Sequence, residues 1–239
     1  MIKEKYIYLF LFISFKLLAQ EYLPKSEGEI IRHKYYTLSY SEDHEQANWV
    51  HYRLNPTLLN GTTPRINSFK ADPNVSTKSA DLSDYKGSGY DRGHLAPAGD
   101  MKYNRESMIE SFFMSNMSPQ DPSFNRGIWR RLEETIREWG KSSEIFISTA
   151  GVLNIENLGS IGGNKVTIPS KYYKVIYSPK NNSMIGFLLS NKGSSSELKS
   201  YVVSVDSIES ITGIDFFHEL LSEIENRLES KFNLEDWNL

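Results

Sequence analysis

The sequence predicts an α+β fold with a mixed or antiparallel sheet and flanking helices. Strand-like stretches rich in Tyr, Val, Ile and Thr occupy residues 30–54, 145–150, 172–177, 184–189 and 201–205. Helical patterns are fewer and lie at residues 108–114, 124–139 and 216–232. The two kinds of element do not alternate regularly, which favours α+β over a doubly wound parallel sheet.

The composition predicts one globular domain with an oxygen- or nitrogen-based chemistry. Hydrophobic residues make up 39% of the 239 residues, which is enough for a substantial core. No segment resembles a linker long enough to divide the chain into two domains. The chain has no cysteine, which excludes disulfides, thiolate zinc sites and a cysteine nucleophile. Any metal ligand is therefore an oxygen or a nitrogen atom.

The first nineteen residues are interpreted as a signal peptide, followed by one domain over residues 20–239. Lys3 and Lys5 precede an apolar run at residues 6–15, and Lys16 follows it. Ten apolar residues are too few to cross a bilayer, which needs about 20. We expect cleavage near Ala19, a secreted or periplasmic protein and no membrane anchor afterwards. An uncleaved anchor is the alternative, because Leu17 stands where a small residue is usual.

Net charge alone does not decide whether the protein binds a polyanion. Residues 20–239 carry 24 basic and 29 acidic side chains, a net charge of −5. From Ser194 onward the net charge is −7, so residues 20–193 sum to +2. Electrostatic steering depends on local potential over about 10 Å. A basic groove can therefore coexist with an acidic C-terminal region on another face.

The N-terminal half is expected to hold two strands and then a long irregular segment. Residues 30–54 show partial alternation, as in Tyr36, Leu38 and Tyr40. Residues 55–90 contain three Xaa-Pro pairs together with several Ser, Asp and Gly residues. An irregular segment of this length inside a compact domain is more often functional than ornamental.

Two amphipathic helices are predicted in the second half. In residues 124–139 an apolar stripe and a charged stripe each repeat at helical spacing, and Gly140 ends the pattern. The charged stripe contains Arg126, Arg130, Glu133 and Arg137. Residues 216–232 form the second predicted helix, which closes the chain.

His94 is distinguished from the other four histidines by its neighbours. It follows Asp91, Arg92 and Gly93, so that a cation and an imidazole flank a glycine that is expected in a turn, where the backbone can approach a ligand. The other histidines sit among polar or core-like neighbours and are expected to be structural. A hydrogen-bonded loop histidine without chemistry is the competing interpretation.

A second cluster precedes the charged helix. Asn116 lies in the run Asn116-Met117-Ser118-Pro119-Gln120, and Asn125 stands at the expected helix start, where asparagine is usually a cap. Glu133 follows eight residues later, about 12 Å up the helix. A carboxylate among arginines is also typical of a solvated ion-pair face. For Asn125 and Glu133, capping or surface roles and functional roles both remain open on residue type alone.

These motifs together resemble the DNA/RNA non-specific endonuclease family, the ββα-metal nucleases that include endonuclease G. The resemblance spans about 190 residues and includes Trp49-Val50-His51-Tyr52, Gly87 to Pro97, Asn116 to Gln120, Phe124-Asn125-Arg126-Gly127 and Thr212 to Phe216. Asp-Arg-Gly-His and the Asn-containing helix start are specific in this order and spacing. Val152-Leu153 departs from the family pattern, which tends to have proline there.

The resemblance implies a ββα-metal (His-Me) finger active site and a role for each matching residue. His94 would be the general base, Asn125 the direct ligand of Mg²⁺, for which Mn²⁺ could substitute, and Glu133 a group that orients the waters around the metal. Asn116 would support the histidine and Arg92 would contact phosphate. Arg65 matches the family's upstream phosphate-binding arginine least securely, with Arg53 or Arg130 as alternatives.

The implied activity is hydrolysis of phosphodiester bonds in both DNA and RNA. Attack by external water does not use the sugar 2′-OH, and phosphate contacts carry no sequence information. Arg65, Arg92, Arg130 and Arg131 are the candidate phosphate contacts. The resemblance also allows a homodimer.

Two other functions compete with this interpretation. One is a non-catalytic nucleic-acid-binding or adhesive protein that retains the fold, against which the presence of His94, Asn125 and Glu133 argues. The other is a secreted hydrolase of a small phosphodiester. It would share the histidine and the metal, but would prefer a dinucleotide ester to long DNA.

Overall fold

A seven-stranded antiparallel sheet forms the centre of the molecule in the computed structural model, which describes residues 21–239. The strands lie side by side in the order in which they occur in the chain, β1-β2-β3-β6-β9-β10-β11. Other elements intervene in the sequence only between β3 and β6, between β6 and β9, and between β10 and β11. Their bounds are β1 Glu29–Arg32, β2 Tyr36–Ser41, β3 Gln46–Leu54, β6 Ile145–Gly151, β9 Lys171–Ser178, β10 Ser183–Ser190 and β11 Val202–Val203. The predicted α+β class is confirmed.

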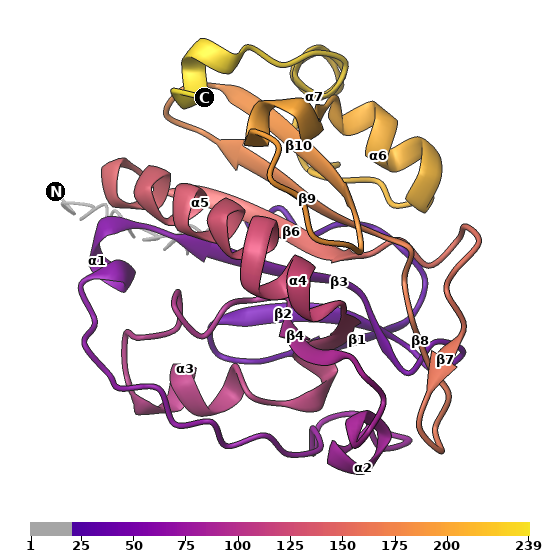
Figure 1. Ribbon diagram of the computed structural model, residues 1–239. Coiled ribbons are helices and arrows are strands. Elements are labelled where there is room, and N and C mark those ends of the chain that lie inside the picture. The colour runs from indigo at the N-terminus through magenta and orange to yellow at the C-terminus, as the bar shows by residue number, and fades with distance from the viewer. Residues whose placement is uncertain (1–20) are drawn as a thin grey trace, which may run out of the picture.

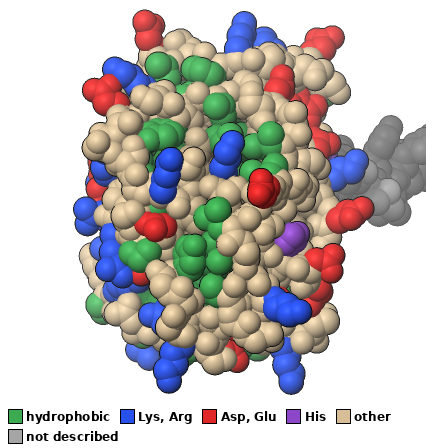
Figure 2. All heavy atoms as spheres, turned by 45° about the vertical axis from the view of Figure 1, so that its right-hand side comes forward, with side chains coloured by type: hydrophobic (Ala, Val, Ile, Leu, Met, Phe, Trp, Pro, Cys, Tyr) green, Lys and Arg blue, Asp and Glu red, His purple; other side chains and the backbone are tan. Residues whose placement is uncertain are grey.

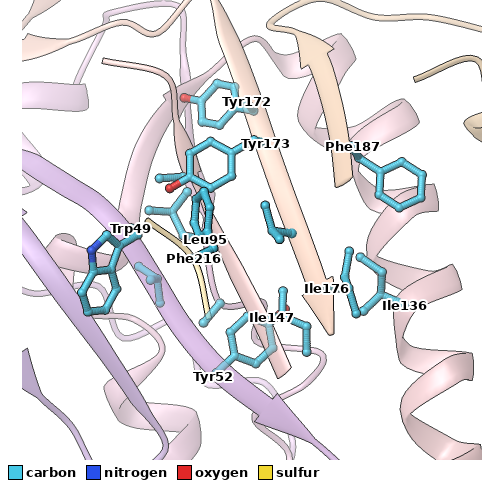
Figure 3. Close-up of a cluster of buried hydrophobic side chains, with 14 of the residues drawn as sticks. Trp49, Tyr52, Leu95, Ile136, Ile147, Tyr172, Tyr173, Ile176, Phe187 and Phe216 are labelled. Carbon is cyan, nitrogen blue, oxygen red and sulfur yellow. The ribbon is translucent and has the colours of Figure 1, made fainter. Parts of the chain in front are cut away.

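Both faces of this sheet are covered, which explains why its central strands are buried along their whole length. Phe187 of β10 stacks on Trp139, whereas the neighbouring Gly186 faces Ile208. Successive side chains of a strand point to opposite faces. The helix that carries Trp139 therefore covers one face and the helix that carries Ile208 covers the other. Figure 1 shows these helices as separate groups, and Figure 3 shows aromatic and aliphatic side chains filling the core.

Seven α-helices and several shorter turns occur in the described residues. The longest is α5, Arg130–Ser142, whose apolar stripe is buried as predicted. The α-helices are α1 Pro56–Leu59, α2 Leu82–Tyr85, α3 Arg105–Glu110, α4 Pro122–Phe124, α5 Arg130–Ser142, α6 Val205–Thr212 and α7 Ser222–Glu229. Single turns are the 3₁₀ segments Met114–Asn116, Leu198–Tyr201 and Leu234–Trp237 and the π-helical segment Asn125–Trp129.

Two small antiparallel pairs complete the fold. Strand β4, Asp91–His94, pairs with β5, Met117–Gln120, and β7, Ser160–Ile161, pairs with β8, Val166–Thr167. The segment before β4 is mostly irregular, as predicted, apart from α1 and α2. It is nevertheless tied to the core, because Asp72 accepts hydrogen bonds from both His33 and Ser115. This anchoring keeps the irregular segment beside β4.

Several predicted elements were wrong in extent. The helix predicted at residues 108–114 forms at Arg105–Glu110, and the strand predicted at 201–205 covers only Val202–Val203. Residues 30–54 hold three strands instead of two, because a turn at residues 33–35 separates β1 from β2. The helix predicted at 124–139 is interrupted at Gly127, whose φ of −107° and ψ of −110° are not helical. The helix predicted at 216–232 forms only over Ser222–Glu229. Phe216 and Phe217 are fully buried beneath the sheet, and Phe217 adopts a φ of 55°, which a helix does not allow.

The interpretation of the first nineteen residues as a signal peptide lies outside the described residues. Within residues 21–239, no helix combines the length and the apolar character needed to cross a membrane.

The structural histidine His51 generates a prediction about stability and pH. Its ring is 4% exposed, and one ring nitrogen, Nδ1, is 2.8 Å from the Ser148 hydroxyl. Burial lowers the pKa of His51 to about 4. The unfolded chain takes up a proton below about pH 6.5, while the folded protein does not until about pH 4. Stability from this residue is therefore present above pH 6.5 and lost as the pH falls toward 4.

We expect His51→Gln to lose less stability than the wild type between pH 7 and pH 4.5. Glutamine can keep the bond to Ser148 but does not titrate. Urea unfolding at each pH should show that the free energy of unfolding of the wild type falls by about 3 kcal/mol more than that of the variant across this window. The exposed His218→Gln is the matched control and should follow the wild type. Parallel curves for His51→Gln and the wild type would contradict the assignment.

Candidate active site

The pairing of β4 with β5 places His94 at the end of a short strand. His94 lies opposite Met117, and Asp91 lies opposite Gln120. Gly93, expected in a turn that approaches a ligand, is instead inside β4. A Cβ atom there would lie 2.1 Å from the Gln120 side chain, so the glycine makes room for a buried amide of the protein itself. The expected reason for this glycine was therefore wrong.

The imidazole of His94 is fixed by two aromatic rings and by the chain that follows it. Phe112 meets it edge-on with ring centroids 4.9 Å apart, and Phe69 lies at 5.8 Å. Asn116 is fully buried, and its side chain accepts a hydrogen bond from Ala96 N at 2.8 Å and donates to Ala96 O at 3.0 Å. Asn116 therefore clamps the backbone immediately after His94 and has no contact with solvent.

The electrostatic surroundings of His94 keep the ring neutral. Burial and then the positive charges of Arg65 and Arg92 lower the pKa of His94 to about 3. The Nε2 atom is buried and, in the described part of the chain, has no hydrogen-bond partner. Because Nε2 is buried, we infer that the ring exchanges protons with solvent through its other nitrogen, Nδ1.

Asn125 is oriented by Asp91. Its amide nitrogen donates to Asp91 Oδ2 at 2.8 Å, and among the described residues its amide oxygen accepts no hydrogen bond. Arg126 binds the same carboxylate through two bonds of 2.6 and 2.8 Å. Although burial opposes it, these bonds lower the pKa of Asp91, so the carboxylate stays charged. Because an amide whose nitrogen is held presents its oxygen on the other side, Asn125 can serve as an oxygen ligand.

Asn125 does not cap a helix N-terminus, which settles an alternative left open by residue type. The cap of α4 is Asp121, which accepts from Ser123 N at 2.8 Å and Phe124 N at 3.3 Å. Asn125 follows α4 and begins the π-helical turn that ends at Trp129. Its side chain is therefore available for another role.

Glu133 belongs to a group of charged side chains where α5 meets the sheet. Arg137 donates to Asp100 at 2.6 Å, and Asp100 is 3% exposed. Lys174 of β9 is completely buried, with its ammonium 4.5 Å from the centre of the Trp129 ring. Burial raises the pKa of Glu133 above its usual range, and the positive charge of Lys174 limits that rise. The carboxylate of Glu133 is thus held in a partly buried, largely compensated setting.

His94, Asn125, Glu133 and Arg137 line one hollow of about 480 Å³, whereas Asn116 and Lys174 lie behind its lining. A second hollow of about 580 Å³ adjoins it, since Arg65, Arg92 and Asn125 line both. The cationic residues along the two hollows are Arg65, Lys86, Arg92, Arg126, Arg130 and Arg137. We call the pair of hollows the arginine groove. Its continuity suits an extended anion better than a compact one.

The phosphate-contact candidates divide into those that line the groove and one that does not. Arg65 lies 5.0 Å from the Phe112 ring and Arg92 lies 4.4 Å from the Phe69 ring, so both flank the rings that hold His94. Arg130 also lines the groove, whereas Arg131 is exposed and does not. Arg53 pairs with Glu144 and is likewise outside it. The face shown in Figure 2 carries both charge signs in scattered positions. In the groove, the arginines outnumber the carboxylates Asp91, Glu133 and Glu134.

Sequence reasoning missed Asp91 and Lys174 as parts of the site. Asp91 was considered only as a sequence neighbour of His94. A carboxylate before Arg-Gly-His could have suggested a hydrogen-bond partner for a later Asn or Arg. Lys174 lies inside the apolar strand Lys171–Ser178. A lone lysine in a buried strand is itself a signal, because an ammonium is almost never fully buried unless it is paired.

The groove also offers a place for a hard divalent cation. The amide oxygen of Asn125 is an oxygen ligand of the kind that Mg²⁺ prefers, and Glu133, whose carboxylate can accept hydrogen bonds from water around a metal, lines the same hollow. With one neutral protein ligand, most of the coordination sphere would remain water. The donor set therefore fits a weakly held Mg²⁺ or Mn²⁺ ion.

Comparison with known proteins gives consistent results. The profile of the DNA/RNA non-specific endonucleases matches residues 14–223. A nuclease of Nostoc sp. is 34% identical over 82% of this chain and 76% of its own length. Mouse mitochondrial nuclease EXOG is 34% identical over 85% of this chain, which spans only 61% of that relative. A solved EndoG/EndoGI complex contains a chain that superposes with a TM-score of 0.75 at 27% identity, covering 83% of this chain and 89% of that one.

Proposed function

The chain belongs to the DNA/RNA non-specific endonuclease family, and on that premise we propose that it hydrolyses phosphodiester bonds of DNA and RNA in the arginine groove. One observation carries the proposal. His94 and Asn125, 31 positions apart in the chain, line the same hollow together with five arginines. A proton acceptor, an oxygen ligand and phosphate-binding cations therefore converge on one place, which is the set that phosphodiester hydrolysis requires.

In this proposal His94 Nδ1 takes a proton from the attacking water. In the free protein the charges of Arg65 and Arg92 contribute to the low pKa of His94. A bound phosphodiester brings negative charge to the same two arginines, which offsets their effect on the ring. The imidazole becomes a stronger base when substrate is present, and it is already deprotonated when substrate arrives.

The arginines bind and orient the scissile phosphate. Arg65 and Arg92 are held against aromatic faces, so their guanidinium groups are positioned before substrate binds. Asn116 acts at a distance from substrate by fixing the backbone beside His94. These fixed positions hold the base and the phosphate in the geometry that the reaction needs. They lower the entropy cost of ordering these groups during catalysis.

A metal ion is proposed as the cofactor, held by Asn125 with Glu133 beside it. When bound, Mg²⁺ would neutralise charge on the phosphate and on the departing 3′ oxygen. Asp91 contributes by holding the amide nitrogen of Asn125, which keeps the amide oxygen on the ligand side. Glu133 is suited to accept hydrogen bonds from waters in the groove. Because the protein supplies few ligands, we expect it to bind Mg²⁺ weakly and to need millimolar Mg²⁺ for activity.

The substrate class follows from the chemical groups that the arginine groove can bind. Its cationic side chains contact phosphate, which DNA and RNA share, so we propose both as substrates. The rival proposals of a non-catalytic binder and of a small-phosphodiester hydrolase are less well supported. The complete set of catalytic residue types argues against the first. Two adjoining hollows lined by arginines argue for a longer anion than the second would need.

The test of the proposed function is plasmid nicking by purified protein. We expect nicking with millimolar Mg²⁺, none in chelator, and a 10²–10⁴-fold lower rate for His94→Ala because its general base is gone. Circular dichroism and the melting temperature should show that the variant is folded. A dinucleotide ester and an RNA transcript run in parallel separate the rivals. Wild-type turnover by His94→Ala would remove the histidine from the mechanism.

Asn125 and Asp121 provide a matched pair that separates a ligand from a helix cap. Asn125→Ala should raise the Mg²⁺ concentration needed for half-maximal nicking by at least about tenfold, while the melting temperature changes little. Asp121→Ala should lose about 1 kcal/mol of stability, because it removes the cap of α4, and should keep the wild-type Mg²⁺ dependence. The reverse pattern would assign the structural role to Asn125.

Export from the cytoplasm is proposed from the leader sequence alone. A basic start, a ten-residue apolar run and Ala19 are typical of a cleaved signal peptide. Expression of the full chain in a bacterial host should yield an exported protein whose intact mass corresponds to a start near residue 20. A retained leader in membrane fractions would support the uncleaved anchor.

A further inference from the structure

Away from the arginine groove, α6 and α7 bring three carboxylates together. Asp206 and Glu209 are one turn apart on α6, and Glu229 is the last residue of α7. One carboxylate oxygen of each lies within 4.8 Å of the others. None of the three lines the arginine groove. We call these residues the α6–α7 acidic cluster.

Glu229 distinguishes this cluster from an ordinary acidic surface. Its side chain is buried, with the residue only 5% exposed. Its Oε1 atom is buried and has no hydrogen-bond partner among the described residues. Leaving a carboxylate oxygen buried without a partner is costly, and the usual remedies are a proton or a cation. The carboxylate that contains this unsatisfied oxygen has an oxygen within 4.8 Å of an oxygen of each of the other two members.

No ion pair compensates the negative charge of the cluster in the described part of the chain. Within residues 21–239, no Lys, Arg or His forms an ion pair with any of its three members. Glu209 has one fixed partner, since its Oε1 accepts a hydrogen bond from Phe216 N at 2.8 Å. Two more carboxylates, Asp215 and Glu225, add negative potential. Much of the net charge of −7 after Ser194 is therefore concentrated around this cluster.

We propose that the α6–α7 acidic cluster is a structural Ca²⁺ site that fastens α7 to α6. Ca²⁺ takes oxygen ligands at about 2.3–2.6 Å, so opposite ligands in its sphere lie up to about 5 Å apart. The spacing of the three oxygens falls within that limit. Asp206 is exposed, which leaves room for waters to complete a flexible sphere. Mg²⁺ demands a smaller and stricter octahedron and sheds water reluctantly, so it fits a two-helix carboxylate clip less well.

The test is thermal unfolding of the whole chelator-treated protein, with and without CaCl₂. The Asn125→Ala background removes the ligand proposed for the active site, so that the remaining effect reports on the cluster. At about 100-fold excess over Kd, Ca²⁺ should raise the melting temperature by about 5–10 °C at pH 8. Titration calorimetry should give one site, and MgCl₂ at equal concentration should give a much smaller shift.

Variants locate the effect. Glu229→Gln should abolish the Ca²⁺ shift, and Asp206→Asn, which alters an exposed side chain and endangers folding least, should weaken Ca²⁺ binding at least tenfold. Glu223→Gln changes an exposed carboxylate elsewhere on α7 and should keep the full shift. An unchanged melting temperature in roughly 5 mM Ca²⁺, or a shift that survives both cluster variants, would overturn the proposal. So would an equal response to Mg²⁺. Because the readout is stability, the result does not depend on nuclease activity.

Discussion

The carboxylate of Asp91 is the point on which the candidate active site depends. It stands at the start of β4 and binds both Asn125 and Arg126, which lie beyond the end of α4. These bonds join the strand that carries His94 to the helical segment that carries the oxygen ligand. They add to the pairing of β4 with β5, which already brings the two segments side by side. Together with that pairing, this short, charge-assisted set of bonds converts a separation of 31 positions into a shared hollow.

A second layer of charged groups connects this site to the central sheet. Lys174 rises from the middle of β9, donates to the carbonyl of Leu95 next to His94, and lies near Glu133. Burying a lysine is costly, and Asp100, Glu133 and the face of Trp129 offset that cost. The same ammonium therefore holds the backbone beside the base and partly compensates the carboxylate of α5. The sheet, which is remote in sequence from both motifs, fixes their separation.

Fold class and site membership were predictable from the sequence because they depend on local signals. Strand composition, the two stripes of α5 and the Asp-Arg-Gly-His run all survive in the structure. The break at Gly127 and the early end of the C-terminal helix were not predictable, since each depends on tertiary packing. Phe216 and Phe217 match a helical pattern, yet burying both rings under the sheet outweighs helix propensity. Lys174 was missed for the same reason, because its partners come from other elements.

The central sheet also separates two opposite electrostatic regions. Phe187 and Gly186, neighbours on β10, face α5 and α6 respectively, so the arginine groove and the α6–α7 acidic cluster lie on opposite faces. The thickness of a sheet with its covering layers exceeds a Debye length of about 10 Å, and screening keeps each region's field local. A chain with a negative total charge can thus present a positive entrance to a polyanion. Repulsion from the acidic face then favours approach in the orientation that brings phosphate to the arginines.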